Sequence, residues 1–405
     1  MNALVLGYGR SGKAAEALLC RSGFSVTVLD GEAVFPKGSF DVAVVSPGIA
    51  LTHPWIIEAK RRGISLKSEL QLGCEELRRQ SWKLLAVTGS KGKSSVVKIV
   101  ANAIGGVPCG NYGLPVCEVA LKDVRRETEG AGDRWAVVEV SSFMMETTEL
   151  PSDAFEAAAI LNLQEDHLDR HGSVAVYHGL KRKLLTFAVK NFVNEGMSSE
   201  HPSIGASEHL WRDSYFDNEI LAGNAAMATE LMRVAGLDDA KIAAAFKAFQ
   251  PLPHRMNLVA EIDGVRYIDD SKATSIAALV AGVKMASARP VPCSLLPAPS
   301  ILLIAGGLPK GDDPKTALPV LTGRVRKVYL IGQSAAAFCA AWTDAVDCEI
   351  CGTMDRAVEC AKREAEKGET VLLSPGTASF DQFRSFGERG DVFAGLVQEK
   401  DKTNE

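Results

Sequence analysis

The sequence predicts an α/β protein made of three domains. Short apolar runs typical of buried strands alternate with helix-like stretches along the 405 residues, and this pattern indicates mainly parallel sheets covered on both faces. A chain of this length exceeds what a single hydrophobic core accommodates. Glycine-rich turns follow two of the apolar runs. We therefore expect a Rossmann-like N-terminal domain over residues 1–78, a P-loop-type central domain over 79–251 and a Rossmann-like C-terminal domain over 252–405.

The N-terminal block begins with an apolar strand, Ala3–Leu6, and the turn GYGRSG at 7–12. A helical pattern over Lys13–Arg21 and a strand over Phe24–Leu29 follow, ending at Asp30, and a further buried strand is expected over Val42–Val45. This is the G-x-G-x-x-G arrangement with an acid after the second strand. It shows that a backbone can approach a diphosphate, and a uridine diphosphate sugar satisfies it as well as a dinucleotide. The block is too short for the usual second dinucleotide half.

The central block carries the most informative segment, AVTGSKGKSSVV at 86–97. A buried strand over Leu84–Val87 leads into a glycine loop, and Lys93 and Ser94 open an apolar helix. Such a helix start attracts phosphate, the lysine adds positive charge and the hydroxyl can hold Mg²⁺. Val87 departs from the Walker A pattern, and an ordinary turn with a surface lysine is the alternative. We interpret the segment as the phosphate loop of an ATPase sheet.

Further elements are expected along the central block. Strands are predicted over Trp135–Val140 and Ala157–Leu163, and helices around Tyr177–Val189 and Leu221–Val234. Residues 191–219 are polar and weakly patterned, so no structure is assigned to them.

Prolines at 251 and 253 end the last helix, and a third block with its own strands follows. The strands expected there are Val265–Ile268, Ile301–Ile304, Val328–Ile331 and Val371–Leu373. Helical patterns lie between them, and the proline-rich stretch Arg289–Ser300 is predicted to be a loop.

Composition and charge exclude several function classes. The net charge of −5 provides no basic field for nucleic acid or an anionic membrane. No apolar run is long enough to span a bilayer, and the N-terminus lacks a signal-peptide pattern. The nine cysteines are scattered, and the pair Cys348 and Cys351 lacks the partners of a zinc site. We expect a cytoplasmic monomer with most thiols buried.

Polar residues follow the central strands where ligands gather in α/β sheets. Glu139 and His167 lie there together with Lys93 and Ser94. Oxygen ligands suit Mg²⁺, so Ser94 and Glu139 are candidate metal ligands, whereas a lone histidine is as easily a solvated loop residue. Polar, turn-rich segments also follow three strands of the last block and could hold a small charged substrate, although each alone reads as an ordinary loop.

Nine segments, taken in order, resemble the Mur ligase family. They are SPG at 46–48, TGSKGKSS at 88–95, GNYGLP at 110–115, EVSSF at 139–143, EDHLDR at 165–170, YHGLK at 177–181, LPHR at 252–255, DDSKAT at 269–274 and SPGTASFDQF at 374–383. The last one favours the members that add D-glutamate, because the Asp-Asn-Pro-Arg motif of relatives adding diaminopimelate or lysine is absent.

The resemblance implies ligation of D-glutamate to UDP-N-acetylmuramoyl-L-alanine, driven by ATP through an acyl phosphate, in peptidoglycan precursor synthesis. The implied catalytic residues are Lys93, His167 and Lys181. The implied ATP contacts are Thr88, Gly89, Ser90, Lys91, Gly92, Lys93, Ser94, Ser95, Asn224, Arg255, Asp270 and Lys272. Two Mg²⁺ sites are implied, the first at Ser94 and Glu139 and the second at His167 and Lys181, a lysine that carries a CO₂-derived carbamate in this family.

The implied substrate contacts fall into three groups. Arg10, Ser11 and Asp30 match positions that contact the uridine diphosphate, and Asn111 matches a contact to the muramoyl substrate or the nucleotide. The D-glutamate positions are Thr274, Lys310, Ser379, Phe380 and Phe386.

The sequence differs from the family pattern at four places, namely Lys91, Ser95, Met227 and Leu308-Pro309. None of them removes a candidate catalytic group. Other readings of the chain are a sister ligase that adds another amino acid, a dinucleotide-dependent oxidoreductase built on Gly7, Gly9, Gly12 and Asp30, and a regulatory nucleotide-binding module.

Overall fold

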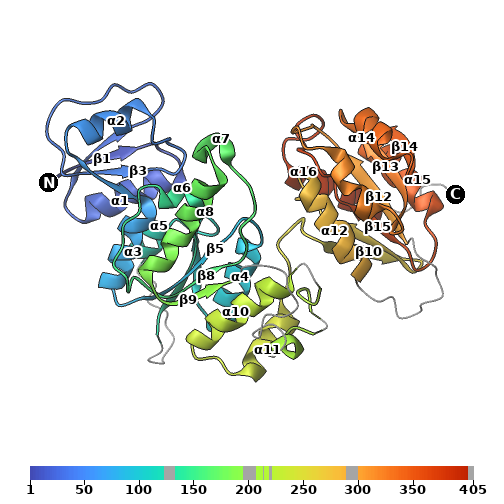
Figure 1. The fold of residues 1–405 in the computed structure, drawn as a ribbon, viewed down its shortest axis with the longest axis horizontal. Coiled ribbons are helices and arrows are strands. Elements are labelled where there is room, and N and C mark those ends of the chain that lie inside the picture. Colours follow the sequence, from blue (N-terminus) through green and yellow to red (C-terminus); the bar gives the residue numbers. More distant parts are fainter. Residues whose placement is uncertain (123–132, 195–206, 213, 219–220, 289–299, 400–405) are drawn as a thin grey trace. The chain divides into compact units, whose positions relative to one another are not determined.

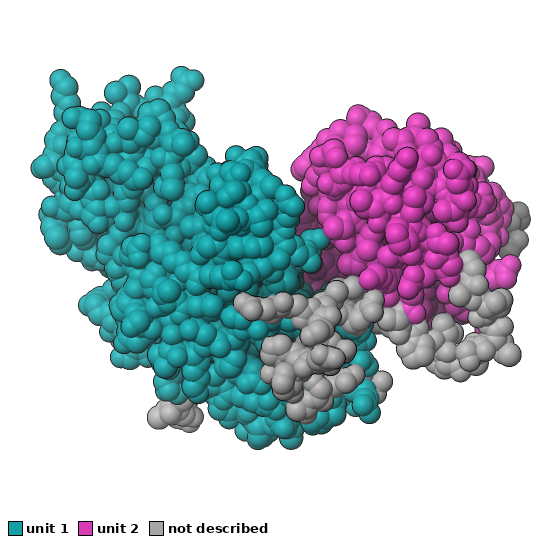
Figure 2. All heavy atoms as spheres, viewed as in Figure 1, with its two compact units in different colours: residues 1–249 teal, residues 250–405 magenta. Residues whose placement is uncertain are grey.

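The computed structural model describes residues 1–122, 133–194, 207–212, 214–218, 221–288 and 300–399. The chain separates into two compact units, residues 1–249 and residues 250–405 (Figure 2). The first unit contains two sheets and the second contains one (Figure 1). The predicted α/β class is confirmed, because strands and helices alternate in both units.

The first sheet is parallel, with strand order β2-β1-β3-β4. Its strands are β1 (Asn2–Leu6), β2 (Ser25–Leu29), β3 (Val42–Val45) and β4 (Ser65–Ser68). The helices of this region are α1 (Arg10–Arg21), α2 (Pro54–Arg61) and α3 (Glu69–Arg79). All strands expected here are present, and β4 is an addition that its polar sequence SLKS concealed.

The second sheet is also parallel, with β5 in the centre of the order β6-β7-β5-β8-β9. Its strands are β5 (Lys83–Thr88), β6 (Val107–Gly110), β7 (Trp135–Glu139), β8 (Phe155–Ile160) and β9 (Ala188–Val193). The helices are α4 (Lys93–Ile104), α5 (Val116–Leu121), α6 (Ser142–Met145), α7 (Leu168–His171), α8 (Val174–Lys183), η1 (Leu184–Phe187), η2 (Glu208–Leu210), α10 (Ala222–Val234) and α11 (Asp239–Ala248).

The predicted helix around Tyr177–Val189 is too long. Helix α8 ends at Lys183, a 3₁₀ turn follows, and residues 188–193 form the edge strand β9. Leu184 and Phe187 are buried in that turn. The strand pairs with β8, so tertiary pairing overrides the helical pattern at this point. The segment 191–219, left without structure, contributes the end of β9 and η2, and residues 195–206, 213 and 219–220 lie outside the described residues.

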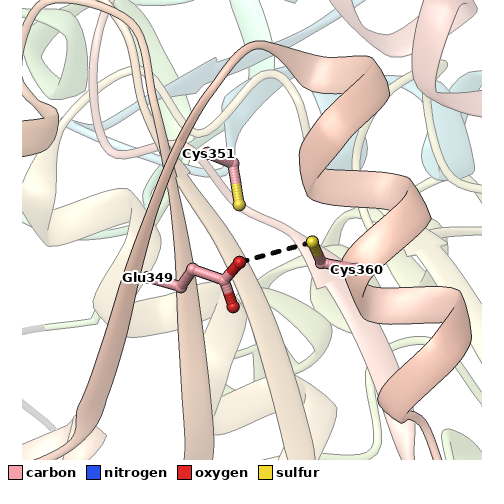
Figure 3. A group of neighbouring side chains, drawn as sticks. All are labelled: Glu349, Cys351 and Cys360. Carbon is pink, nitrogen blue, oxygen red and sulfur yellow. Dashed lines mark hydrogen bonds between the residues drawn. The ribbon is translucent and has the colours of Figure 1, made fainter.

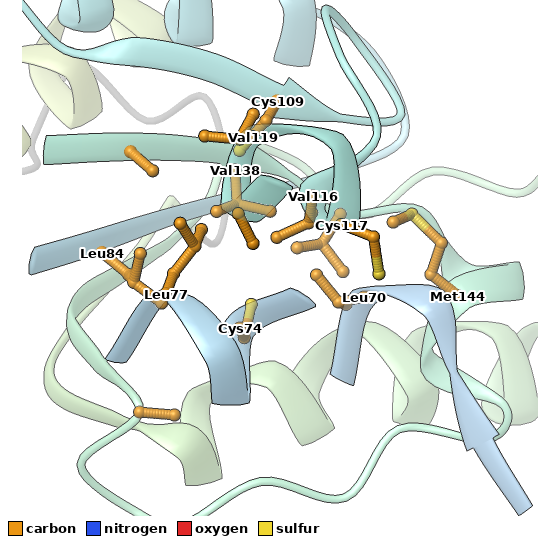
Figure 4. Packing of buried hydrophobic residues seen from close by; sticks show 14 of the residues in the cluster. Leu70, Cys74, Leu77, Leu84, Cys109, Val116, Cys117, Val119, Val138 and Met144 are labelled. Atoms are coloured by element: carbon orange, nitrogen blue, oxygen red, sulfur yellow. The ribbon is translucent and has the colours of Figure 1, made fainter. Parts of the chain in front are cut away.

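The two sheets of the first unit share one hydrophobic core. Leu70 and Leu77 on α3 pack in the same cluster as Leu84 on β5 and Val116 on α5 (Figure 4). Glu69 lies beside this cluster, and its carboxylate accepts a 2.7 Å hydrogen bond from the backbone N–H of Cys117 at the start of α5. The strands of the first sheet all fall within the predicted domain 1–78, and those of the second within the predicted domain 79–251. The shared core contains residues from both sides of residue 78, so the domain boundary there stays a prediction.

The second unit is built on a sheet of order β10-β11-β15-β12-β13-β14, parallel except for the β10–β11 hairpin. The strands are β10 (Asn257–Ile262), β11 (Val265–Asp269), β12 (Ile301–Gly306), β13 (Val325–Ile331), β14 (Asp347–Gly352) and β15 (Thr370–Leu373). The helices are α12 (Ile276–Ala288), η3 (Pro314–Ala317), α13 (Leu318–Leu321), α14 (Ala335–Trp342), α15 (Met354–Glu364) and α16 (Phe386–Gln398). Except for Ser300, the predicted loop Arg289–Ser300 lies outside the described residues.

Candidate active site

The phosphate loop connects β5 to α4 and depends on two glycines. Gly89 has φ of 151° and Gly92 has φ of 85°, backbone conformations that side-chain-bearing residues rarely adopt. A Cβ atom at Gly92 would also lie 2.1 Å from the Nδ2 atom of Asn224, a buried residue of α10. Helix α4 begins directly after the loop, so its first N–H groups and its dipole face the place where a phosphate would bind.

Two lysines converge on one backbone oxygen of this loop. The ammonium of Lys93 donates to the carbonyl of Gly89 at 2.9 Å and to that of Ser90 at 3.1 Å. The ammonium of Lys181, on α8, donates to the same Gly89 carbonyl at 2.8 Å. Lys181 is only 2% exposed, and burial, reinforced by the charge of Lys93, lowers its pKa to about 7. The structure therefore brings together two residues that lie 88 positions apart in the sequence.

Glu139 ends β7 with a buried carboxylate that is only half satisfied. Its Oε1 atom accepts a 2.7 Å hydrogen bond from the side chain of Asn111. Its Oε2 atom is buried and has no hydrogen-bond partner among the described residues. A buried carboxylate oxygen without a partner is costly, and a divalent cation would satisfy it. The chemistry of the Glu139 carboxylate therefore fits Mg²⁺, and Ser94 as its partner ligand stays a prediction.

His167 lies just before α7 in a left-handed backbone conformation, with φ of 52°. Its ring packs on Phe143 with 4.8 Å between ring centroids, and its Nε2 atom lies 3.7 Å from Asp166. The side chain remains exposed, which leaves a ring nitrogen accessible to a ligand.

Asn162 and Tyr177 hold the phosphate loop in place, and neither residue was assigned a role from the sequence. Asn162 accepts from the backbone N–H of Lys91 at 2.8 Å and donates to the Lys91 carbonyl at 2.9 Å. The Tyr177 hydroxyl lies 3.2 Å from that of Ser90, and its ring centroid is 4.6 Å from the Lys181 ammonium. Tyr177 precedes Lys181 by four residues, and on a helix this spacing places the two side chains next to each other, so the sequence held a signal for this contact.

Two other residues of the predicted ATP set are engaged within the fold. The Thr88 hydroxyl donates to the carbonyl of Val140, and Ser95 is buried in the first turn of α4.

The N-terminal glycine turn packs tightly. A Cβ atom on Gly12 would lie 2.0 Å from the carbonyl oxygen of Gly7, so only glycine fits there. The carboxylate of Asp30, at the end of β2, accepts from the backbone N–H of Tyr8 at 3.1 Å. Arg10 donates to the carbonyl of Gly113 at 3.2 Å, and Ser11 lies beside it in the first turn of α1. Arg10, Ser11 and Asp30 thus lie at one end of the first sheet.

In the second unit, Asp270 follows β11 and is buried against Ser374, whose hydroxyl donates to it at 2.9 Å. Burial raises the pKa of Asp270 to about 7. The Nε atom of Arg255 is buried without a hydrogen-bond partner among the described residues. Lys272 lies over the ring of Phe386, 5.4 Å from its centroid. The structure therefore gathers Arg255, Asp270 and Lys272 around the end of one strand.

The remaining predicted D-glutamate positions lie in loops of the same unit. Backbone hydrogen bonds join Leu308 to Ala378 in both directions, which brings the loop of Lys310 beside that of Ser379. Lys310 is exposed, Phe380 is 70% exposed and Ser379 is buried. Thr274 bonds through its backbone to Lys272. Their role in binding D-glutamate stays a prediction.

Arg389, on α16, is a buried residue that the sequence analysis missed. Its guanidinium donates to the carbonyls of Ser271, Thr377 and Ala378. It thereby fixes the segments that carry Asp270 and Ser379.

Comparison with known proteins places these features in a family. The model of the Mur ligase middle domain matches residues 87–195, and that of the Mur ligase glutamate ligase domain matches residues 254–376. The UDP-N-acetylmuramoylalanine–D-glutamate ligase of Acidobacterium capsulatum is 32% identical, covering 97% of this chain and 95% of that protein. The enzyme of the same name from Chlamydia abortus is also 32% identical, covering 98% and 97%.

Solved structures show the same fold. The UDP-N-acetylmuramate-alanine ligase MurC of Thermotoga maritima matches with a TM-score of 0.56 at 16% identity, covering 98% of this chain and 99% of that one. The MurF ligase of the same organism, solved with ADP, matches with a TM-score of 0.54 at 15% identity, covering 88% and 94%. Among the described helices, none combines the length and apolar character needed to cross a membrane.

The glycine loop, its two lysines and the half-satisfied Glu139 lie within the matched middle domain, and relatives at 32% identity extend over nearly the whole chain. The chain belongs to the Mur ligase family.

Proposed function

We propose that the protein joins D-glutamate to UDP-N-acetylmuramoyl-L-alanine at the expense of ATP, in peptidoglycan precursor synthesis. The convergence of Lys93 and Lys181 on the phosphate loop carries the proposal, since it places at the loop one cation for phosphoryl transfer, Lys93, and one buried amine, Lys181, that a carbamate would convert into a metal ligand. The choice of D-glutamate rests on the names of the relatives, which cover nearly the full chain.

The loop and the start of α4 would bind the ATP phosphates, and Lys93 would balance charge on the phosphoryl group in transfer. Ser94 and Glu139 would hold one Mg²⁺, and His167 with a carbamylated Lys181 would hold a second. When bound, these ions neutralise phosphate charge so that an anionic carboxylate can approach. Asn224, Arg255, Asp270 and Lys272 would complete the ATP contacts.

The chemistry proceeds by activation of a carboxylate. The terminal carboxylate of the L-alanine residue attacks the γ-phosphorus of ATP, forming an acyl phosphate and releasing ADP. The deprotonated amine of D-glutamate then attacks the acyl carbon, and the tetrahedral intermediate expels inorganic phosphate. Hydroxide is a much poorer leaving group than phosphate, which is why ATP is required. No residue is assigned as the base that deprotonates the amine.

The predicted substrate contacts form two sets. Arg10, Ser11 and Asp30 would bind the uridine diphosphate at the glycine turn of α1, and Asn111 would contact the muramoyl substrate. Thr274, Lys310, Ser379, Phe380 and Phe386 would form the D-glutamate site, where the lysine pairs with a carboxylate. We expect the enzyme to be a monomer. We also expect it to work in the cytoplasm, since ATP and proteins with free thiols are typical of that compartment.

The test is an amino-acid panel. The protein is incubated with ATP, Mg²⁺ and UDP-N-acetylmuramoyl-L-alanine, and phosphate release is followed with each candidate amino acid. We expect release only with D-glutamate. Release with another amino acid indicates a sister ligase, and tight NADH binding without any ATP-dependent release indicates the oxidoreductase built on the N-terminal glycine turn.

A further inference from the structure

Two cysteines and a glutamate meet at the edge of the second unit, far along the chain from the residues assigned to catalysis. Glu349 and Cys351 lie on the edge strand β14, and Cys360 lies on helix α15 (Figure 3). One ligand atom from each, two sulfurs and a carboxylate oxygen, lies within 4.8 Å of the other two. The Cys360 sulfur lies 3.4 Å from the Oε1 atom of Glu349 and donates a hydrogen bond to it.

The alternation of the strand explains why these three residues meet. Residues i and i+2 of a strand share a face, so Glu349 and Cys351 both face α15. Cys348, the other cysteine of the C-x-x-C pair, points to the opposite face, where its thiol interacts with that of Cys339 on α14. The C-x-x-C spacing therefore does not define the cluster, and the third member comes from a helix nine residues beyond Cys351.

The distances suit a tetrahedral ion with soft ligands. A Zn–S bond is about 2.3 Å long, which places two sulfurs on one ion roughly 3.8 Å apart. Side-chain rotations are enough to reach this spacing from separations below 4.8 Å. Cys360 is fully buried, whereas Glu349 and Cys351 are half-buried, so an ion can reach the cluster from the edge of the sheet.

The surrounding charges also suit an anionic cluster. Two thiolates and a carboxylate carry three negative charges, so a divalent ion leaves one uncompensated. The ammonium of Lys327 lies 2.7 Å from the Oε2 atom of Glu349, leaving Oε1 for an ion. Burial raises the pKa of Cys351 to about 12 and Arg356 offsets only part of this rise, so the ion must displace the thiol proton, and Arg363 interacts with the Cys360 thiol. These cations, which also pair with Glu359 and Glu364, would offset part of the remaining charge.

We propose that Glu349, Cys351 and Cys360 bind one soft divalent cation of the Zn²⁺ class, with a fourth position open to water. Binding replaces two thiol protons, which pass to solvent, by two metal–sulfur bonds. The ion would tie the edge strand β14 to α15. It differs from the Mg²⁺ ions proposed for catalysis, which prefer oxygen ligands, so this inference does not depend on the proposed function.

The test uses Cd²⁺ alone as the probe on the full-length, freshly reduced chain, because cadmium–thiolate bonds absorb in the ultraviolet. We expect one equivalent of Cd²⁺ to produce the charge-transfer band with release of two protons, and Zn²⁺ to abolish the band by competition. Cys351→Ser and Cys360→Ser should each lose the stoichiometric band, and Glu349→Gln should weaken binding.

The matched control is Cys348→Ser, which removes a thiol from the same strand but from its other face. We expect its band and stoichiometry to equal those of the wild type. Cys351 is half-buried, so Cys351→Ser should keep its folding even where Cys360→Ser loses it, and circular dichroism checks both. The absence of a stoichiometric band in the wild type, or a band lost in Cys348→Ser and kept in Cys351→Ser, would overturn the proposal.

Discussion

Lys93 and Lys181 donate to the same oxygen, the backbone carbonyl of Gly89, at 2.9 and 2.8 Å. Two ammonium groups sharing one neutral acceptor repel each other, and burial together with this repulsion lowers the pKa of Lys181. This arrangement is stabilised when negative charge enters between them, either as a phosphate at the loop or as a carbamate on Lys181.

Replacement of Lys93 by alanine removes the charge that balances the transferring phosphoryl group. We expect phosphate release to fall by a factor on the order of 10² to 10³ or more, the usual cost of losing a preorganised transition-state contact. The measurement is steady-state phosphate release with all three substrates. Lys190→Ala, at an exposed position of β9, serves as the charge-matched control, and an equal loss in both variants would contradict the assignment.

Replacement of Glu139 by glutamine keeps an oxygen for the Asn111 hydrogen bond and removes the negative charge. We expect activity to require far more Mg²⁺, because the orphaned Oε2 atom is the proposed ligand. We also expect the melting temperature to stay equal or rise, since an unpaired buried carboxylate is costly. An unchanged Mg²⁺ requirement would argue against the metal site.

Lys181 should react with CO₂, because its lowered pKa leaves much of the amine neutral at pH 7.5 and only the neutral amine forms a carbamate. Activity should fall after removal of CO₂ and return on addition of bicarbonate. ¹³C-labelled bicarbonate should yield a carbamate signal in the wild type that is missing in Lys181→Ala. Activity that is indifferent to CO₂, with no carbamate signal, would count against carbamylation.

Asn162 is expected to act as a positioning residue for the phosphate loop. Replacement by alanine removes both hydrogen bonds to Lys91, which loosens the loop. We expect kcat/KM for ATP to fall by roughly ten- to a hundredfold, the scale of a small misplacement, while KM for D-glutamate stays unchanged. If kcat/KM for ATP and KM for D-glutamate both change to the same extent, the substitution has caused a general structural defect instead.

The stability of the chain should depend on the titration of Glu69. Burial raises its pKa from 4.5 to about 7, so between these values the folded chain holds a proton that the unfolded chain has lost. The contribution of Glu69 is therefore present below pH 4.5 and is lost as the pH rises through 7, by roughly 3 kcal/mol in total.

Glu69→Gln removes this titration while keeping an acceptor for the Cys117 N–H. Relative to the wild type, the variant should gain stability on going from pH 5 to pH 8, as measured by denaturant unfolding. Glu75→Gln, on the same helix but more exposed, is the control. Wild-type and Glu69→Gln curves that run parallel with pH would show that Glu69 does not titrate in this range.

Much of the site was predictable from local patterns, because a buried strand, a glycine loop and a helix start occur together in the sequence. Lys93, Ser94 and Glu139 follow from this logic. Lys181 does not follow from this local pattern, because it lies on helix α8, and only the resemblance to the family indicated it. Tyr177 was missed although its i, i+4 spacing to Lys181 was visible, since its other partner is the hydroxyl of Ser90 on a distant segment. Asn162 and Arg389 were missed because their partners are mainly backbone groups of other segments, and sequence spacing does not reveal such partners. Strand β9 was missed for the same reason, since it is defined by its pairing with β8.

The central claim is that ATP activates a carboxylate by phosphorylating it. The most direct measurement uses UDP-N-acetylmuramoyl-L-alanine labelled with ¹⁸O in the terminal carboxylate, followed by mass analysis of the phosphate released with D-glutamate. We expect each phosphate to carry one ¹⁸O atom, transferred from the carboxylate when the acyl phosphate breaks down. Phosphate that forms at the full rate of ligation without any ¹⁸O would contradict it.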